Sequence, residues 1–160
     1  MGVNTQIISG FPGVGKSYAC TFNFFKCLDS DSSNFSWESE GVRHPDFPEN
    51  YMKHIKENQG KAWTIMVSSH KVVREALEAH GIEYTLVYPD KSLKAEYLDR
   101  YRKRGNDEKF IKFIGDHWDV FIDEIEQDIF PKKIKLGSGE YLGDAKFRIW
   151  GTLEDRKEEE

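Results

Sequence analysis

The sequence contains few cysteines and no long apolar run, and both shortages narrow the class of protein. Its two cysteines, Cys20 and Cys27, stand in one expected helix about 10 Å apart by helix rise, so we expect them not to pair. No apolar run approaches the roughly 20 residues that cross a bilayer. The N-terminus shows neither a basic segment nor a cleavage site for export. We therefore expect a cytoplasmic protein without a membrane span or a disulfide framework.

Positive charge is also scarce. The chain has 23 lysines and arginines against 28 aspartates and glutamates, which gives a net charge of -5. Non-specific affinity for DNA or RNA comes from many cationic side chains that neutralise phosphates. We therefore expect no general nucleic-acid binding.

The residues that are present predict one globular α/β domain. A length of 160 residues fits a single domain that can bury a core without disulfides. Apolar, β-prone runs alternate with helical patterns, which predicts a three-layer parallel sheet with helices on both faces and with ligands at the carboxyl ends of its strands. We expect strands near Val3–Ser9, Trp63–Val67, Tyr84–Tyr88 and Ile134–Leu136, and helices at Lys16–Leu28 and from Tyr51, Val72, Ser92 and Phe110. The domain is predicted at 1–150, with an acceptor-binding insert at about 32–60, a short helical lid at about 92–106 and a charged tail at 151–160.

A glycine-rich motif follows the first expected strand. Gly10-Phe11-Pro12-Gly13-Val14-Gly15-Lys16-Ser17 matches the P-loop pattern G-x-x-x-x-G-K-[ST] in full and precedes an expected helix. In this motif, glycines let backbone N–H groups converge on phosphate oxygens, the lysine adds a charge near the β and γ phosphates, and the serine can hold Mg²⁺. We predict that ATP and Mg²⁺ bind through Gly10, Gly13, Val14, Gly15, Lys16, Ser17 and Tyr18.

Two aspartates stand at the expected end of the second strand. Asp29 and Asp31 form a D-x-D pattern, and strand alternation would point both carboxylates to one side, close to the glycine loop. We predict that Asp29 orients Mg²⁺ or contacts the acceptor, and that Asp31 holds or deprotonates an acceptor hydroxyl. A solvated turn is the alternative, because Asp and Ser favour turns.

Four arginines complete the predicted site. Arg100 and Arg104 are four positions apart on one helix face, where they can clamp the transferring phosphates when the lid closes. We predict catalytic roles for both and an open position for both in the absence of ligands. Arg43 and Arg74 are predicted to reach an anionic acceptor. For the lid pair, the alternative is a solvated helix end that the helix dipole favours.

The segment Trp118-Asp119-Val120-Phe121-Ile122-Asp123-Glu124 resembles an apolar strand that ends in Asp-Glu, the Walker B pattern of motor and AAA-type ATPases. Apolar residues nevertheless recur with a 3.6-residue period from Phe110 to Ile125, which predicts a long amphipathic helix. In that helix Trp118, Ile122 and Ile125 face inward, and Asp119 and Asp123 face mostly outward.

The order of these parts resembles the P-loop nucleoside and nucleotide kinase family, the adenylate-kinase-like branch, and in particular its small bacteriophage-encoded members. The likeness covers roughly residues 5–145. For a phage-encoded protein, the location would be the host cytoplasm. The resemblance implies donor-phosphate contacts for Gly10, Gly13, Gly15, Lys16 and Ser17, metal or acceptor contacts for Asp29 and Asp31, lid roles for Arg100 and Arg104, and an acceptor-phosphate contact for Arg74.

The function predicted on these grounds is ATP-dependent transfer of the γ-phosphoryl group to a small acceptor, in the first place a (deoxy)nucleoside monophosphate. One alternative keeps the kinase but makes the acceptor a nucleoside or a polynucleotide 5′-hydroxyl. Another is a P-loop ATPase that hydrolyses ATP to act on a partner. The expected partner is the small-molecule nucleotide acceptor. We expect no membrane partner, and a homodimer is possible.

Overall fold

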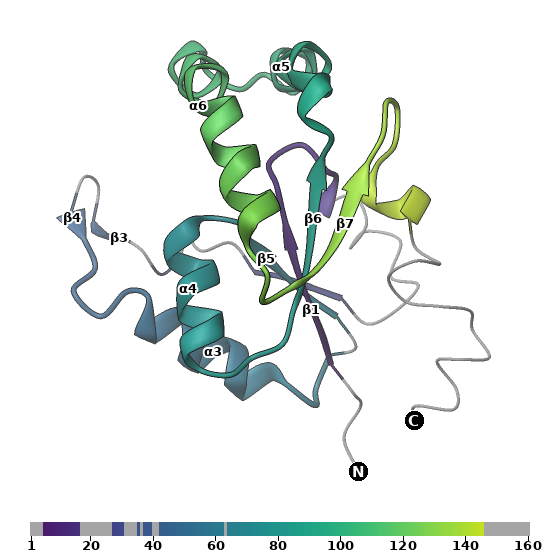
Figure 1. Ribbon diagram of the computed structural model, residues 1–160. Coiled ribbons are helices and arrows are strands. Elements are labelled where there is room, and N and C mark those ends of the chain that lie inside the picture. Colours follow the sequence, from purple (N-terminus) through teal and green to yellow (C-terminus); the bar gives the residue numbers. More distant parts are fainter. Residues whose placement is uncertain are drawn as a thin grey trace.

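The computed structural model describes residues 5–16, 27–30, 35, 37–39, 42–62 and 64–145, with only the backbone at 37–39. Strands and helices alternate along most of this part of the chain (Figure 1). The strands are β1 (Gln6–Gly10), β2 (Cys27–Asp29), β3 (Trp37–Ser39), β4 (Val42–Arg43), β5 (Thr64–Ser68), β6 (Thr85–Pro89) and β7 (Lys132–Leu136). The helices are α3 (Glu49–Asn58), α4 (Lys71–Ala79), α5 (Lys94–Lys103) and α6 (Glu108–Gln127), with two short 3-10 helices, η1 (Lys91–Leu93) and η2 (Leu142–Ala145).

Five strands form one parallel sheet in the order β2-β5-β1-β6-β7. Every residue of β5 and β6 is buried, as is all of β1 after its first residue. Strands covered on both faces are rich in apolar residues along their whole length, which is why these three were recognisable as short apolar runs. The expected α/β class with a parallel sheet is confirmed.

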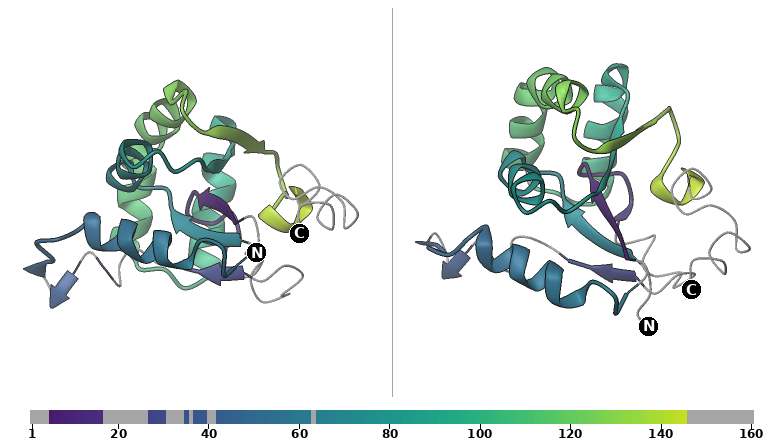
Figure 2. Two further views of the ribbon diagram at one scale, coloured as in Figure 1. Left: turned by 90° about the horizontal axis from the view of Figure 1, so that it is seen from below. Right: turned by 60° about the horizontal axis from the view of Figure 1, so that its bottom comes forward.

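The described helices cover one face of this sheet. The connections from β2 to β5, from β5 to β6 and from β6 to β7 all step in the same direction across it, so right-handed crossovers place their helices on the same side. In Figure 1, α3, α4 and α6 lie to one side of the strands, and Figure 2 shows the same arrangement from two further directions. The helix expected after the glycine loop would cover the opposite face, but residues 17–26 lie outside the described part of the chain.

The start of β2 corrects one sequence-based expectation. Cys27 and Leu28 belong to this strand rather than to the helix that was expected to run to Leu28. Cys27 is disulfide-bonded, which contradicts the expectation that the cysteines do not pair. That expectation rested on the distance that a single helix containing both cysteines would set between them. Because Cys27 lies in β2, this distance no longer applies. Cys20 itself lies outside the described residues.

Helix α6 is the long amphipathic helix that the 3.6-residue period predicts. Trp118, Ile122 and Ile125 are among its buried residues, whereas Asp119 and Asp123 are exposed, so the predicted faces are confirmed. The interpretation of this segment as a Walker B strand is wrong, because the segment is helical throughout. The fully buried ring of Trp118 meets the edge of the Phe11 ring with 5.5 Å between centroids, so α6 packs against the start of the glycine loop.

In the expected insert, β3 and β4 form a separate antiparallel hairpin that precedes α3. Of the helices that the structure describes, none combines the length and the apolar character that a membrane span requires. The charged tail predicted at 151–160 falls outside the described residues.

Candidate functional site

The candidate site is built around the loop at residues 10–16, which leaves the carboxyl end of the central strand β1. Gly13 and Gly15 have φ angles of 92° and 95°, in the left-handed region that side-chain-bearing residues rarely adopt. A Cβ atom on Gly13 would also lie only 3.0 Å from a ring carbon of Tyr101. The loop can therefore take this path only with glycine at both positions. It brings together the predicted residues Gly10, Gly13, Val14, Gly15 and Lys16.

Each carbonyl group from Gly10 to Val14 accepts a hydrogen bond, and most of the donors belong to other parts of the chain. Two helix side chains, one lysine within the loop and two backbone N–H groups supply these bonds. The donors are Lys16 Nζ to Gly10 at 2.6 Å, Val14 N to Phe11 at 3.2 Å, Tyr101 Oη to Pro12 at 2.7 Å, Arg100 Nη1 to Gly13 at 2.9 Å and Leu142 N to Val14 at 2.8 Å.

This pattern orients the N–H groups of the loop. In a trans peptide the C=O and N–H groups point in opposite directions. Because the carbonyls of Pro12 and Val14 are bound by donors from α5 and η2, the N–H groups of Gly13 and Gly15 turn away from those elements. Backbone N–H groups of a loop can form a binding site for anions where they point to a common position. The ammonium of Lys16 lies over the same loop and adds a full positive charge.

Arg100 is a buried residue that binds the glycine loop, and it does not lie in an open lid. Its side chain is 8% exposed and lies between the rings of Tyr97 and Tyr141, with its guanidinium carbon 4.3 and 3.9 Å from their centroids. It donates to the backbone carbonyls of Gly13 and Glu140 at 2.9 and 3.0 Å. The prediction that Arg100 lies open in the absence of ligands is wrong. The physical reason is that it shares the buried face of α5 with Tyr97 and Tyr101, and this face packs against the glycine loop.

Arg104 lies one turn further along, at the C-terminal end of α5, and is exposed. The four-residue spacing places both arginines on one side of the helix. Among the described residues, however, other parts of the chain bury Arg100 and leave Arg104 exposed. A role for Arg104 at transferring phosphates stays a prediction.

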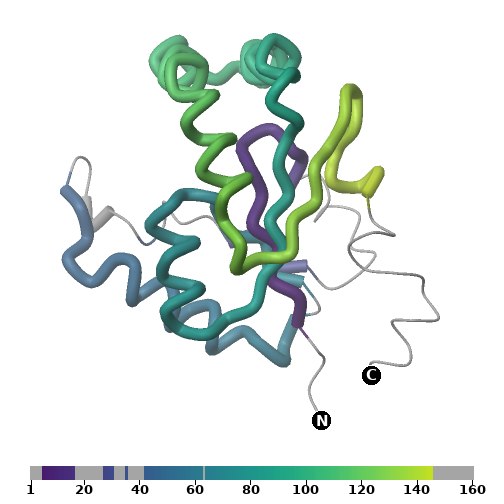
Figure 3. Tube along the Cα trace, in the orientation of Figure 1, coloured from purple at the N-terminus to yellow at the C-terminus, as the bar shows by residue number. Residues whose placement is uncertain are grey.

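The turn after β7 belongs to the same site, as Figure 3 shows by the course of the yellow trace beside the purple glycine loop. Glu96 of α5 accepts from Ser138 Oγ at 2.6 Å and Gly139 N at 3.0 Å, and it binds Arg100 at 3.0 Å. These hydrogen bonds, with that of Ser138 the strongest, hold the pKa of Glu96 below its usual value. The carboxylate therefore stays charged and ties the turn to α5.

Sequence reasoning missed two contributors to the loop, Tyr101 and Tyr141. Burial raises the pKa of Tyr101, so its hydroxyl keeps the proton that it donates to Pro12. The Tyr141 ring lies against Gly15, where a Cβ atom would be 3.3 Å from a ring carbon. Tyr101 was recognisable only as a core position of an amphipathic helix, and no sequence signal connected either tyrosine to the loop.

Arg74 is buried and bound to other parts of the chain. Its side chain is 7% exposed, donates from Nη1 to Asp128 at 2.8 Å and from Nε to the Ser69 carbonyl at 3.0 Å. Asp128, at the end of α6, provides the counter-charge of Arg74 in this structure, and a contact of Arg74 with an acceptor phosphate stays a prediction. Burial, together with the nearby Asp128 carboxylate, raises the pKa of Tyr84, whose hydroxyl donates to the same carboxylate at 3.4 Å.

Arg43 lies in β4, and its guanidinium carbon is 5.8 Å from the ring centroid of Phe47. The β3–β4 hairpin projects from the body of the molecule, away from the glycine loop in both Figure 1 and Figure 2. The described structure therefore does not bring Arg43 together with the loop.

Asp29 is exposed at the carboxyl end of β2, and the glycine loop likewise follows the carboxyl end of its parallel strand β1. One strand, β5, separates β2 from β1, which corresponds to roughly 10 Å at normal strand spacing. The next residue, Ser30, is fixed by two hydrogen bonds: its N–H donates to Met66 at 2.9 Å, and its carbonyl accepts from the buried Tyr51 hydroxyl at 2.6 Å. Helix α3 thus holds the chain directly after Asp29.

Three predicted site residues, Ser17, Tyr18 and Asp31, lie outside the described residues. Within the part of the chain that the structure describes, no group of three or more histidine, cysteine or acidic side chains could hold a metal ion. Asp29 is therefore the one predicted metal ligand whose position is described.

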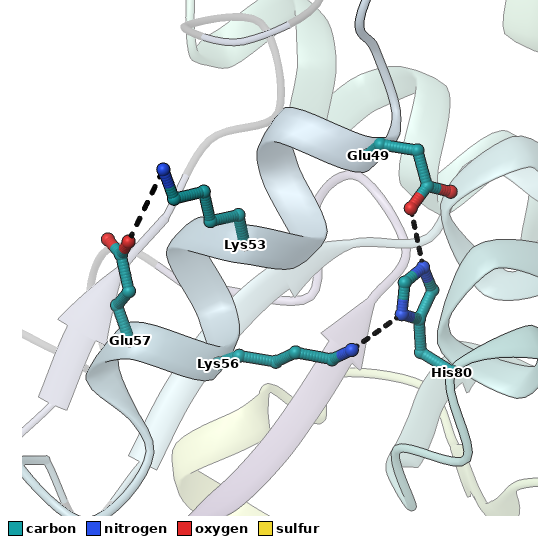
Figure 4. A pocket seen from close by; sticks show the side chains of 5 residues that line it. All are labelled: Glu49, Lys53, Lys56, Glu57 and His80. Atoms are coloured by element: carbon teal, nitrogen blue, oxygen red, sulfur yellow. Dashed lines mark hydrogen bonds and ion pairs between the residues drawn. The ribbon is translucent and has the colours of Figure 1, made fainter.

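A hollow of about 400 Å³ lies elsewhere, between α3 and the end of α4, and carries no predicted site residue. Its side chains mainly bind one another: His80 lies 2.7 Å from both Glu49 and Lys56, and Lys53 pairs with Glu57 at 3.9 Å (Figure 4). These contacts join α3 to α4, and we assign no ligand to the hollow.

The amino-acid sequence matches none of the protein-family models and none of the curated proteins with which it was compared. The class of this protein is therefore inferred from its own sheet, loop and side chains.

The buried position of Arg100 predicts that Arg100→Lys destabilises the protein by about 1 to 3 kcal/mol, because lysine keeps the charge but loses the planar, multidentate contacts. Urea unfolding followed by tryptophan fluorescence measures this loss. The matched control is Arg102→Lys, an exposed change on the same helix, which we expect to stay within about 0.5 kcal/mol of the original protein. Equal stability of both variants would instead support the alternative interpretation, in which Arg100 is part of a solvated helix end.

Proposed function

We propose that this protein is a P-loop phosphotransferase that binds ATP at Gly10–Ser17 and transfers its γ-phosphoryl group to a small acceptor. The observation that carries the proposal is the loop itself. Its carbonyls from Gly10 to Val14 are all bound by donors, two of its N–H groups are turned the other way, and Lys16 lies over it. Such a loop fits a phosphate chain, because N–H dipoles and an ammonium charge stabilise phosphate oxygens before and during transfer.

Mg²⁺ is the cofactor that this chemistry requires, and when bound it neutralises charge on the β and γ phosphates. Hydroxyl and carboxylate oxygens are its preferred protein ligands. Ser17 directly follows Lys16 in the sequence, and Asp29 presents an exposed carboxylate at the same edge of the sheet, so these residues fit the group. We propose that they hold it.

For the acceptor, a (deoxy)nucleoside monophosphate is the first candidate, as the resemblance implies. One observation favours an acceptor without a phosphate. A bound phosphate needs cationic partners, but Arg74 is committed to Asp128 and Arg100 to the loop. The second candidate is therefore a nucleoside, a polynucleotide 5′-hydroxyl or another alcohol, with Asp31 holding or deprotonating the hydroxyl.

A screen of nucleosides and nucleoside monophosphates with ATP and Mg²⁺ tests both candidates. We expect phosphorylated product and ADP in equal amounts with at least one acceptor. Product from nucleosides but not from monophosphates would select the second candidate. ADP formation that no acceptor increases would instead favour an ATPase that acts on a partner, and absence of ATP binding would reject the proposal.

A further inference from the structure

Glu96 joins α5 to the turn at residues 137–141, which connects β7 to η2, and its single carboxylate binds three donors. Its Oε1 accepts from Ser138 Oγ at 2.6 Å, and its Oε2 accepts from Gly139 N and from Arg100 Nη2, both at 3.0 Å. Hydrogen bonds to an ionised acceptor are roughly twice as strong as those between neutral groups. Glu96 has no place in the glycine motif, yet two lines of contact lead from it to the glycine loop.

The first line of contact runs through Arg100. Its Nη2 donates to Glu96 and to the Glu140 carbonyl, while its Nη1 donates to the Gly13 carbonyl at 2.9 Å. The guanidinium is planar, so acceptors that hold Nη2 also determine the direction of Nη1. Glu96 supplies a counter-charge as well, which an arginine side chain that is only 8% exposed requires. Without Glu96, the guanidinium would lose one of the acceptors that fix its tilt toward the loop.

The second line of contact runs through the turn at residues 137–141. Glu96 holds the tip of this turn to α5, and directly after the turn Leu142 N donates to the Val14 carbonyl at 2.8 Å. The C=O and N–H groups of a trans peptide point in opposite directions, so this bond also sets the direction of the Gly15 N–H group. The position of the turn therefore affects an N–H group of the proposed phosphate site.

We infer that Glu96 is a positioning residue of the glycine loop, which supports the Gly13 carbonyl through Arg100 and aims the Gly15 N–H group through the turn. The inference rests on the proposed function, because it takes the loop as the site that holds the phosphates of ATP. Glu96 lies outside the loop and acts through the loop backbone. A hydrogen bond weakens steeply as its angle departs from the optimum, so a small displacement of the loop lowers its affinity for phosphate oxygens.

Isothermal titration calorimetry with ATP and Mg²⁺, in the absence of an acceptor, tests this inference. We expect Glu96→Ala to raise the dissociation constant for ATP about tenfold, because both lines of contact are lost at once. Glu96→Gln should stay within about threefold of the original protein, since its amide oxygen can replace Oε2 and its amide N–H can donate to the Ser138 hydroxyl. The matched control is Asp99→Ala, which removes an exposed acidic side chain from the same helix and should leave the affinity unchanged.

Thermal unfolding beside the titration separates a positioning role from a merely structural one. If Glu96→Ala lowers the Tm but its folded form binds ATP as the original protein does, the inference is wrong. If Glu96→Ala does not fold, Ser138→Ala decides instead: it removes only the bond to Oε1 and should raise the dissociation constant about twofold to threefold, and an unchanged constant overturns the inference. An original protein that binds no ATP would overturn the proposed function and this inference together, a result distinct from equal binding by all variants.

Discussion

Replacing Lys16 with alanine is expected to lower phosphoryl transfer by on the order of 10²- to 10³-fold while the protein stays folded. The ammonium is one of two full positive charges bound directly to the glycine loop; the other, the Arg100 guanidinium, is buried against the Gly13 carbonyl. Removing the ammonium takes away stabilisation of the charge that develops on the phosphates, whereas the backbone of the loop keeps its bonds to Arg100, Tyr101 and Leu142. Steady-state kinetics with the best acceptor, beside thermal unfolding, measure both effects.

Lys61→Ala is the matched control, because Lys61 is exposed and lies in the turn before β5, at the opposite edge of the sheet. We expect its activity and stability to equal those of the original protein. If Lys16→Ala keeps activity within a few-fold of the original protein, the assignment of the loop as a phosphate site is wrong. If it unfolds, Lys16→Arg provides the second test, since it keeps a charge but alters its position.

Arg74→Met is expected to destabilise the protein by about 3 to 5 kcal/mol, because it leaves the carboxylate of Asp128 without its partner in a largely buried position. Methionine keeps most of the apolar volume of the arginine stem, so the loss measures the broken pair rather than a cavity. Urea unfolding gives the free energy. Below the transition, the KM for the acceptor should not change, since Arg74 is buried and bound to Asp128.

The control for this prediction is Lys71→Met in the same helix. Lys71 pairs with Glu75 at 3.9 Å on the surface, and such pairs contribute little, so we expect a change within about 0.5 kcal/mol. A large rise in the acceptor KM of Arg74→Met, with stability nearly unchanged, would contradict the structure and restore the acceptor-phosphate role.

The parts of the fold that could be predicted from the sequence are those specified by local pattern. The period of α6 correctly overruled its likeness to a Walker B strand, because burial of one helix face repeats every 3.6 residues whatever the fold. The first strand and the glycine loop after it were also recognisable, since buried parallel strands are short apolar-rich runs. Strand β2 is short and only partly buried, and its residues Cys27 and Leu28 were assigned to the preceding helix. The loop residues of the candidate site were named from the glycine motif, and their role in phosphate binding stays a prediction.

The partners of Arg74 and Arg100 could not be predicted. Arg100 was predicted to lie open in a lid, and Arg74 was predicted to reach an anionic acceptor. Their actual partners stand far away in the sequence: Asp128 lies 54 positions from Arg74, and the Gly13 carbonyl lies 87 positions from Arg100. Which charged side chain becomes buried depends on what the tertiary fold brings opposite it, and no local period carries that information.

The hydrogen bond from Leu142 to Val14 affects when the glycine loop can take its final shape during folding. Residues 10–16 are synthesised before α5 and η2, which supply three of the donors that shape them. Domains form as units during synthesis, and contacts between distant segments wait until both have emerged. A nascent chain that contains the whole glycine motif but not yet η2 therefore lacks the hydrogen bond from Leu142 that holds the loop. The glycine loop is therefore expected to take its final shape only after the segment that contains η2 has emerged and folded.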